Sequence, residues 1–197
     1  MKAKKYGLGF LAAVTMLVTA GHTAAEPPVL PKEIYEWVQS TARAGYYFNR
    51  QQMGYAVRKD GTIDLNILIV PTVKLYDQVQ IDDVVAKRRW RMQDCRGYDD
   101  LVGAADYLRF DLAAGTVEVT EHDDLDSKLA TLSMETTGKP VSLEKFSSKD
   151  VDGKFYRAIL DYAAQNRRML INRSWGKLTP EDKERLAAEE TQAAEKE

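Results

Sequence analysis

The feature that most constrains the fold is the segment 53–70, in which two apolar stretches flank a Lys59-Asp60-Gly61 turn. A two-residue Asp-Gly turn would place Val57 opposite Asp64, whereas a three-residue loop places Val57 opposite Ile63. Paired residues of a hairpin share a face, so hydrophobic matching favours the three-residue loop, with Gly61 in a left-handed position. The same register pairs Tyr55 with Leu65 and Met53 with Ile67.

A second hairpin is expected over residues 107–120, with Ala114-Gly115 at its tip. Pairing Leu112 with Val117, and Phe110 with Val119, places the apolar residues on one face. This register also sets Asp111 opposite Glu118, with Arg109 available as the bridging cation. Residues 67–70 are apolar without alternation, which indicates a strand end covered on both faces before Pro71 interrupts the ladder.

Helical spacing predicts helices in three further segments. Pro31 suits the first turn of a helix that ends near Gly45 and carries Ile34, Trp37, Val38 and Thr41 on one face. A stronger pattern covers 151–163, with Arg167 and Arg168 in its last turn, and Thr179-Pro180 caps a charged segment that continues to Glu197. Residues 72–104 fit either a strand or a helix opened by Asp77 and Gln80, and the choice stays open.

These patterns predict an α+β fold: a single domain over residues 26–178, with two antiparallel hairpins packed by helices. Residues 179–197 are expected to form a helical or disordered tail, because Leu186 is their only large apolar side chain.

The N-terminus predicts export. Three lysines precede an apolar run of about fifteen residues and a small-residue site ending at Ala25, which is the pattern of a cleaved signal peptide over residues 1–25. Three of the 28 Lys and Arg residues leave with it, so 25 face 30 Asp and Glu, a net charge of −5. We therefore expect a periplasmic or secreted protein with no stable membrane anchor and no nucleic-acid partner.

Cys95 is the only cysteine, so the domain is expected to have no internal disulfide and to carry a free thiol. A cysteine nucleophile needs a histidine base, and His122 is the only histidine after residue 25. Burial of Cys95 or a disulfide to another chain is favoured over catalysis.

Motifs for cofactor or metal chemistry are absent from the sequence. There is no P-loop, dinucleotide fingerprint or Gly-x-Ser-x-Gly elbow, and Ile67 and Ile159 stand where two EF-hand-like segments would need a glutamate. The acidic segment 121–126 around His122 is expected to be a solvated loop. We expect no cofactor and no metal.

Residues 86–100 combine five cations with one tryptophan. The favoured interpretation makes Trp90 a buried anchor, with its arginines paired to nearby aspartates, because residues 82–100 hold five acids and five bases. The alternative is a partner-binding patch in which aromatic rings lie beside arginines. Its candidate residues are Arg88, Arg89, Trp90, Arg91, Arg96 and Tyr47.

The sequence thus favours an exported cell-envelope accessory or binding protein that engages another envelope protein. The alternative is a small cofactor-independent enzyme that uses carboxylates or tyrosines. A pocket with converging Asp, Glu, His or Tyr would favour the enzyme, and an exposed apolar-aromatic patch with a polar rim would favour the binding protein.

Overall fold

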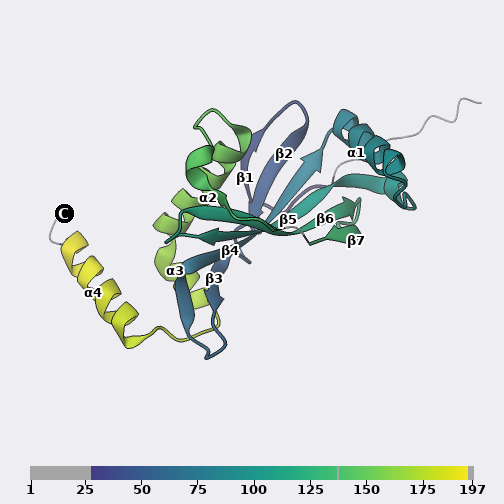
Figure 1. Ribbon diagram of the computed structural model, residues 1–197. Helices are drawn as coiled ribbons and strands as arrows, with labels where there is room; N and C mark the ends of the chain where they lie inside the picture. Colours follow the sequence, from purple (N-terminus) through teal and green to yellow (C-terminus); the bar gives the residue numbers. More distant parts are fainter. Residues whose placement is uncertain (1–27, 137, 195–197) are drawn as a thin grey trace, which may run out of the picture.

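The computed structural model describes residues 28–136 and 138–194, and the predicted signal peptide lies outside this part (Figure 1). An antiparallel sheet of eight strands forms the centre of the described chain. Six strands follow the order β1-β2-β4-β5-β6-β7, while β3 pairs with β4 and β8 pairs with β6. The strands are β1 (Tyr35–Ser40), β2 (Ala44–Asn49), β3 (Gly54–Val57), β4 (Ile63–Tyr76), β5 (Leu101–Asp111), β6 (Thr116–Asp126), β7 (Thr131–Glu135) and β8 (Val141–Ser142).

The helices occupy different ends of this sheet. Figure 1 shows α1 at one end of the long strands, whereas α2 and α3 lie together at the other, and α4 extends away from the sheet. The α+β class expected for a single domain is confirmed. The helices are α1 (Gln78–Trp90), α2 (Val151–Gln165), α3 (Arg167–Arg173) and α4 (Pro180–Ala194), with 3-10 turns at Tyr98–Asp100 and Leu143–Lys145.

The main core lies between α2 and one face of the sheet. Phe155, Ile159 and Ala163 of α2 are buried at the predicted helical spacing. They pack in one cluster with strand residues, and the rings of Phe48 and Tyr162 meet edge-on with centres 5.2 Å apart. Burial of this apolar face is what holds the helix, because short helices are marginal alone. The buried strand residues of the cluster include Phe48, Leu68, Val70, Leu108, Phe110 and Val117.

The helix predicted from Pro31 to Gly45 is wrong. A single turn follows Pro31, whose carbonyl accepts hydrogen bonds from the amides of Ile34 and Tyr35 at 3.0 and 2.9 Å, and the chain then enters β1. Aromatic and β-branched residues favour a strand when an edge is available for pairing. Here β2 supplies that edge, with Trp37 opposite Tyr47, and this pairing outweighs the helical spacing.

The first hairpin is confirmed at its turn and differs further along. Val57 pairs with Ile63, and Gly61 has φ of 82°. Beyond a bulge in β4, however, Tyr55 pairs with Leu68 instead of Leu65. Met53 lies before β3, so its predicted pairing with Ile67 is absent from the described ladder.

The expected interruption of the ladder at Pro71 is also wrong, although three of the four residues before it are buried as predicted. β4 continues to Tyr76 with β2 on one side and β5 on the other, so both neighbours hold it beyond the proline. This continuation carries Thr72 and Lys74 across the sheet.

The second hairpin forms with a register two residues away from the predicted one. Phe110 pairs with Val117, and the loop is closed by Ala114 N–H donating to the Asp111 carboxylate at 2.9 Å. This longer loop sets Arg109 opposite Glu118, with Nη1 and Oε2 3.8 Å apart. The observed register thereby avoids the acid-on-acid pair that the predicted one required.

The segment left open at residues 72–104 contains the end of β4, the helix α1 and the start of β5. Asp77 caps α1 by accepting a hydrogen bond from the Gln80 amide at 2.7 Å, which satisfies one free donor of the first turn. Thr179 caps α4 in the same way, with the Asp182 amide 3.1 Å from its hydroxyl oxygen. Leu186 of α4 is partly buried against the main core.

Arg167 and Arg168, expected in the last turn of α2, instead begin α3 after a break at Asn166.

Candidate functional site

A bulge in β6 decides which face of the sheet receives its polar residues. Thr120 is the extra residue opposite the step from Tyr107 to Leu108, and its hydroxyl donates to the Tyr107 carbonyl at 2.9 Å. One extra residue reverses the alternation of side chains along a strand. His122 and Asp124 therefore lie on the same face as the buried Val117.

The segment 121–126, predicted to be a solvated loop, belongs to β6 instead. It pairs with β5 on one side and with β7 on the other, and Asp123, Asp124 and Leu125 are buried. Backbone pairing on both sides explains how such a polar segment stays extended.

Alternating charges run across the sheet from β4 to α1. Asp106 joins Lys74 on one side (Oδ2 to Nζ, 2.8 Å) and His122 on the other (Oδ1 to Nδ1, 2.6 Å). Asp124 then lies 3.5 Å from His122 Nε2 and 3.5 Å from Arg88 Nη1. We call these five residues the charge line.

Both carboxylates of the charge line are buried, with side chains 6% and 7% exposed for Asp106 and Asp124. Asp124 gains two further donors, the Tyr98 hydroxyl at 2.6 Å and the Ser133 hydroxyl at 3.1 Å. Burying a charge is costly unless it is paired and hydrogen-bonded, and both carboxylates of the charge line meet these conditions.

Pairing governs the protonation of the charge line. Hydrogen bonds to Asp106 and Asp124 raise the pKa of His122 to about 10. Burial alone would raise the pKa of Asp106, but the His122 hydrogen bond and the Lys74 charge outweigh it and lower that pKa to about 2. The pKa of Lys74 is raised because Asp106 outweighs the effect of burial. At neutral pH His122 and Lys74 are therefore protonated and Asp106 is ionised.

This state determines what His122 can do chemically. A general base must offer a free ring nitrogen near neutral pH. Both ring nitrogens of His122 face carboxylates, and its raised pKa keeps the ring protonated. In the described residues no group of three or more His, Cys, Asp or Glu is placed to hold a metal. The charge line acts instead as a polar core for the end of the sheet beyond α2.

Arg88, a predicted binding residue, is part of this polar core. Its side chain is 12% exposed, and its guanidinium donates to the Asp94 carbonyl at 3.0 Å. It therefore holds the last turn of α1 against β6.

Trp90 is not the buried anchor that the sequence favoured. It is 83% exposed, and no residue of α1 is buried. In the last turn of α1, Arg88 is the residue that reaches β6. Trp90 lies more than half a turn further around the helix, so its side chain points into solvent. Arg89 and Arg91, both exposed, flank Trp90.

The cations beside Trp90 are not neutralised by the nearby acids. Asp83 pairs with Arg43 at 3.0 Å, and Asp94 pairs with Arg96 at 2.6 Å. Arg88 pairs with Asp124, but within the described residues no ion pair reaches Lys87, Arg89 or Arg91. We define the α1 patch as Lys87, Arg89, Trp90, Arg91 and Met92.

Met92 ends α1 in a conformation that usually belongs to glycine. Its φ is 55°, and its amide donates to the Arg89 carbonyl at 3.0 Å while the Gln93 amide donates to the Arg88 carbonyl at 3.0 Å. This is a Schellman ending, in which a residue with a side chain carries a conformational cost. Met92 is also 93% exposed, so packing of its side chain within the chain does not compensate for the conformational cost.

The other candidate residues lie apart from the α1 patch. Arg96 is exposed and bound to Asp94. Tyr47 in β2 packs in a second cluster with Leu30 and Val73 on the opposite face of the sheet. Tyr46 and Phe48 therefore pack with α2 on one face of the sheet, while Tyr47 packs with Leu30 on the other face. Cys95 is half-buried and free, with Sγ 3.5 Å from the Gln93 carbonyl oxygen.

All three tryptophans of the chain are exposed: Trp37 by 56%, Trp90 by 83% and Trp175 by 97%. Tryptophan is highly buried on average, and exposed tryptophan beside arginine is common in binding surfaces. Sequence reasoning missed Trp175 because its glycine neighbour indicated only a turn. It also missed the contact of Lys74 and Asp106 with His122, because residues 72–104 were left open and residues 121–126 were expected to be a loop.

Comparisons of the chain with protein-family models, with curated proteins and with solved structures find no match. None of the described helices is both long enough and apolar enough to cross a membrane.

Proposed function

We propose that this chain is an exported cell-envelope accessory protein that binds another envelope protein through the α1 patch. The observation that carries the proposal is the exposure of Trp90 beside cations that have no carboxylate partner in the described residues. The partner surface that complements this patch is acidic, with an apolar pocket for the indole ring.

Three properties of the α1 patch support binding. Trp90 and Met92 supply apolar area with two arginines at their rim, which is the composition of a binding hot spot. Arg88 fixes the helix beneath them, so little ordering is needed when a partner docks. The strained ending at Met92 is typical of functional positions, where a conformational cost is kept for another purpose.

The alternative, a small enzyme without a cofactor, gains no support from the charge line. Its carboxylates and histidine converge, but each is already engaged by an opposite charge. A catalytic role would need one of them to be free for substrate.

The test is capture from a cell-envelope extract by the mature chain, with chemical crosslinking and identification by mass spectrometry. The captured protein is then purified, and its affinity is measured directly. Trp90→Ala should weaken that affinity by at least about tenfold, because truncating a hot-spot tryptophan typically costs 2 kcal/mol or more. Affinity should also fall with rising salt, since Arg89 and Arg91 contribute charge.

Trp37→Ala is the matched control, because Trp37 is also an exposed tryptophan and lies in β1. It should leave the affinity unchanged. Equal affinities for the Trp90→Ala variant and the unmodified chain would refute the α1 patch as the binding surface. N-terminal sequencing of exported material tests the compartment separately, with Glu26 expected as the first residue.

A further inference from the structure

Trp175, in the segment between α3 and α4, combines an exposed ring with a fixed backbone. The preceding residue, Ser174, is buried, and its hydroxyl accepts from the Tyr55 amide at 2.9 Å and donates to the Leu170 carbonyl at 2.8 Å. These bonds tie the start of the segment to both β3 and α3.

The other side of Trp175 is held by the tip of the first hairpin. Lys177 N–H donates to the Gly61 carbonyl, and its carbonyl accepts from the Ile63 amide, both at 2.9 Å. Gly176 precedes Lys177, and a Cβ atom at this position would lie only 2.9 Å from Ile63 Cγ1. Glycine therefore allows the segment to approach the hairpin this closely. The ring of Trp175 is therefore presented from a backbone anchored on both sides.

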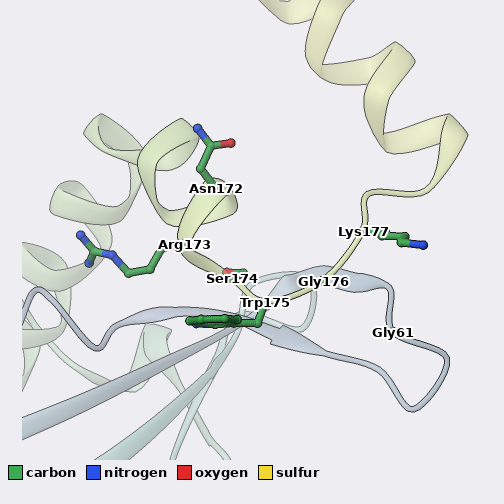
Figure 2. A pocket seen from close by; sticks show the side chains of 7 residues that line it. All are labelled: Gly61, Asn172, Arg173, Ser174, Trp175, Gly176 and Lys177. Carbon is green, nitrogen blue, oxygen red and sulfur yellow. The ribbon is translucent and has the colours of Figure 1, made fainter.

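Two adjoining hollows share Trp175 in their walls. One has a volume of about 660 Å³ and is seen in Figure 2, where the Trp175 ring lies beneath Ser174 and is viewed edge-on. The second has a volume of about 380 Å³. Both hollows are wide open to solvent, so they suit a ligand that lies along the surface and keeps one face in water. Besides Trp175, the lining residues with polar side chains are Asn172, Arg173, Ser174, Lys177, Gln51, Gln52 and Tyr55.

The charge of this lining differs from that of the whole chain. Among the described residues that line the two hollows there is no aspartate or glutamate, although the chain has 30 acidic residues. Arg173 is held in place, with Nη1 donating to the Arg50 carbonyl and Nη2 3.6 Å from Met169 Sδ. Its guanidinium keeps further N–H donors, and Lys177 adds a second cation.

We propose that these hollows form a binding site for acidic saccharides. A pyranose ring has an apolar face of C–H groups that stacks on an indole, while its hydroxyls need polar partners such as the amide group of Gln52. The Gln51 amide nitrogen already donates to the Glu33 carbonyl at 3.0 Å, which leaves its amide oxygen as an acceptor. A carboxylate on the sugar would meet Arg173, whose side chain extends to the same side of the segment as the Trp175 ring (Figure 2), in a charge-assisted hydrogen bond. The Lys177 side chain points away from the ring and would add positive charge at the rim of the site. An exposed aromatic ring on an anchored backbone suits a ring-shaped polar ligand, because the backbone of the site needs little ordering to bind it.

The experiment is titration of the mature chain with hexagalacturonate, followed by calorimetry and tryptophan fluorescence. Binding is expected, and Trp175→Ala should weaken it by at least about tenfold, whereas Trp175→Phe keeps an aromatic ring and most of the affinity. Trp90→Ala and Trp37→Ala should leave this affinity unchanged, which separates the saccharide site from the α1 patch. Since Trp175 is 97% exposed, Trp175→Ala should also keep the melting temperature.

Two further titrations identify what is recognised. Neutral maltohexaose should bind more weakly than hexagalacturonate, and Lys177→Gln should reduce that difference. A hexaglutamate peptide, which carries charge without sugar rings, should bind more weakly as well. Equal affinity for the peptide would overturn the saccharide assignment, and equal affinity for maltohexaose would overturn the acidic preference. Absence of hexagalacturonate binding, or full binding by Trp175→Ala, would overturn the site itself.

Discussion

The guanidinium carbon of Arg88 lies 4.2 Å from the centre of the Tyr98 ring, in a cation–π contact that ends the charge line. Tyr98 is buried, and its hydroxyl donates to Asp124, the same carboxylate that Arg88 approaches. Arg88 therefore connects the last turn of α1 to both the Tyr98 ring and the Asp124 carboxylate. The position of the α1 patch depends on this junction.

Arg88→Ala should lower the free energy of unfolding by about 2–4 kcal/mol, because it leaves Asp124 buried with one fewer opposite charge. Arg89→Ala, which changes an exposed neighbour, should cost less than about 0.5 kcal/mol. Urea denaturation of the two variants compares them directly. Equal costs would mean that the Arg88 contacts contribute little to stability.

Trp90→Ala should change the free energy of unfolding by no more than about 0.5 kcal/mol, since the ring is 83% exposed. Burial of Trp90 would instead predict a loss of about 3–5 kcal/mol. A thermal melt alongside the partner affinity separates structure from binding. A large drop in melting temperature would show that the indole packs on the domain in solution.

The charge line predicts a stability maximum in mildly acidic solution. The pKa of His122 is about 10 in the folded chain, above its ordinary 6.5, so its contribution is complete below pH 6.5 and is lost as the pH rises towards 10. The pKa of Asp106 is about 2, below its ordinary 3.8, so its contribution is lost as the pH falls from 3.8 towards 2.

Urea denaturation between pH 4 and pH 10 measures the alkaline loss, which we expect to be on the order of 2 kcal/mol because the partly exposed ring is screened by solvent. His122→Gln should be less stable at pH 6 and should lack most of this loss. An unchanged alkaline slope in His122→Gln would assign the effect to another group.

Met92→Gly should stabilise the chain by about 0.5–1 kcal/mol, because glycine adopts a φ of 55° without the cost that a side chain carries. If the thioether contacts a partner, the same substitution should weaken partner binding. The two measurements should therefore move in opposite directions. A variant that is destabilised would show that the left-handed conformation is not kept in solution.

Local signals in the sequence were sufficient where one short-range rule decided the structure. Gly61 marked its turn because a left-handed residue was needed there, and the buried face of α2 followed from the spacing of Phe155 and Ile159. Thr179 and Pro180 marked the start of α4 in the same way. In each case the deciding contacts lie within a few residues or on one helix face.

Pairing between distant strands could not be predicted with the same rules. The spacing around Trp37 is compatible with a helix, but this segment pairs with β2 as a strand. The register of the second hairpin depended on a loop two residues longer than expected. The burial of Trp90 was predicted wrongly because the charge count of residues 82–100 considered only acids within that segment. Arg88 instead pairs with Asp124, which lies outside the segment, and this contact turns Arg88 towards the sheet and leaves Trp90 exposed. The candidate site depends on such long-range partners, so its charge line was missed.

The extra residue at Thr120 has a consequence for how this chain can vary in length. It sets the phase between the apolar half of β6, which faces α2, and the polar half, which holds His122 and Asp124. Removing one residue there would turn both polar side chains to the opposite surface and leave Lys74 and Arg88 facing gaps, while every amino acid of the charge line stayed the same. Homologous chains should therefore tolerate insertions at the 112–115 loop much better than any change of length between Val119 and His122.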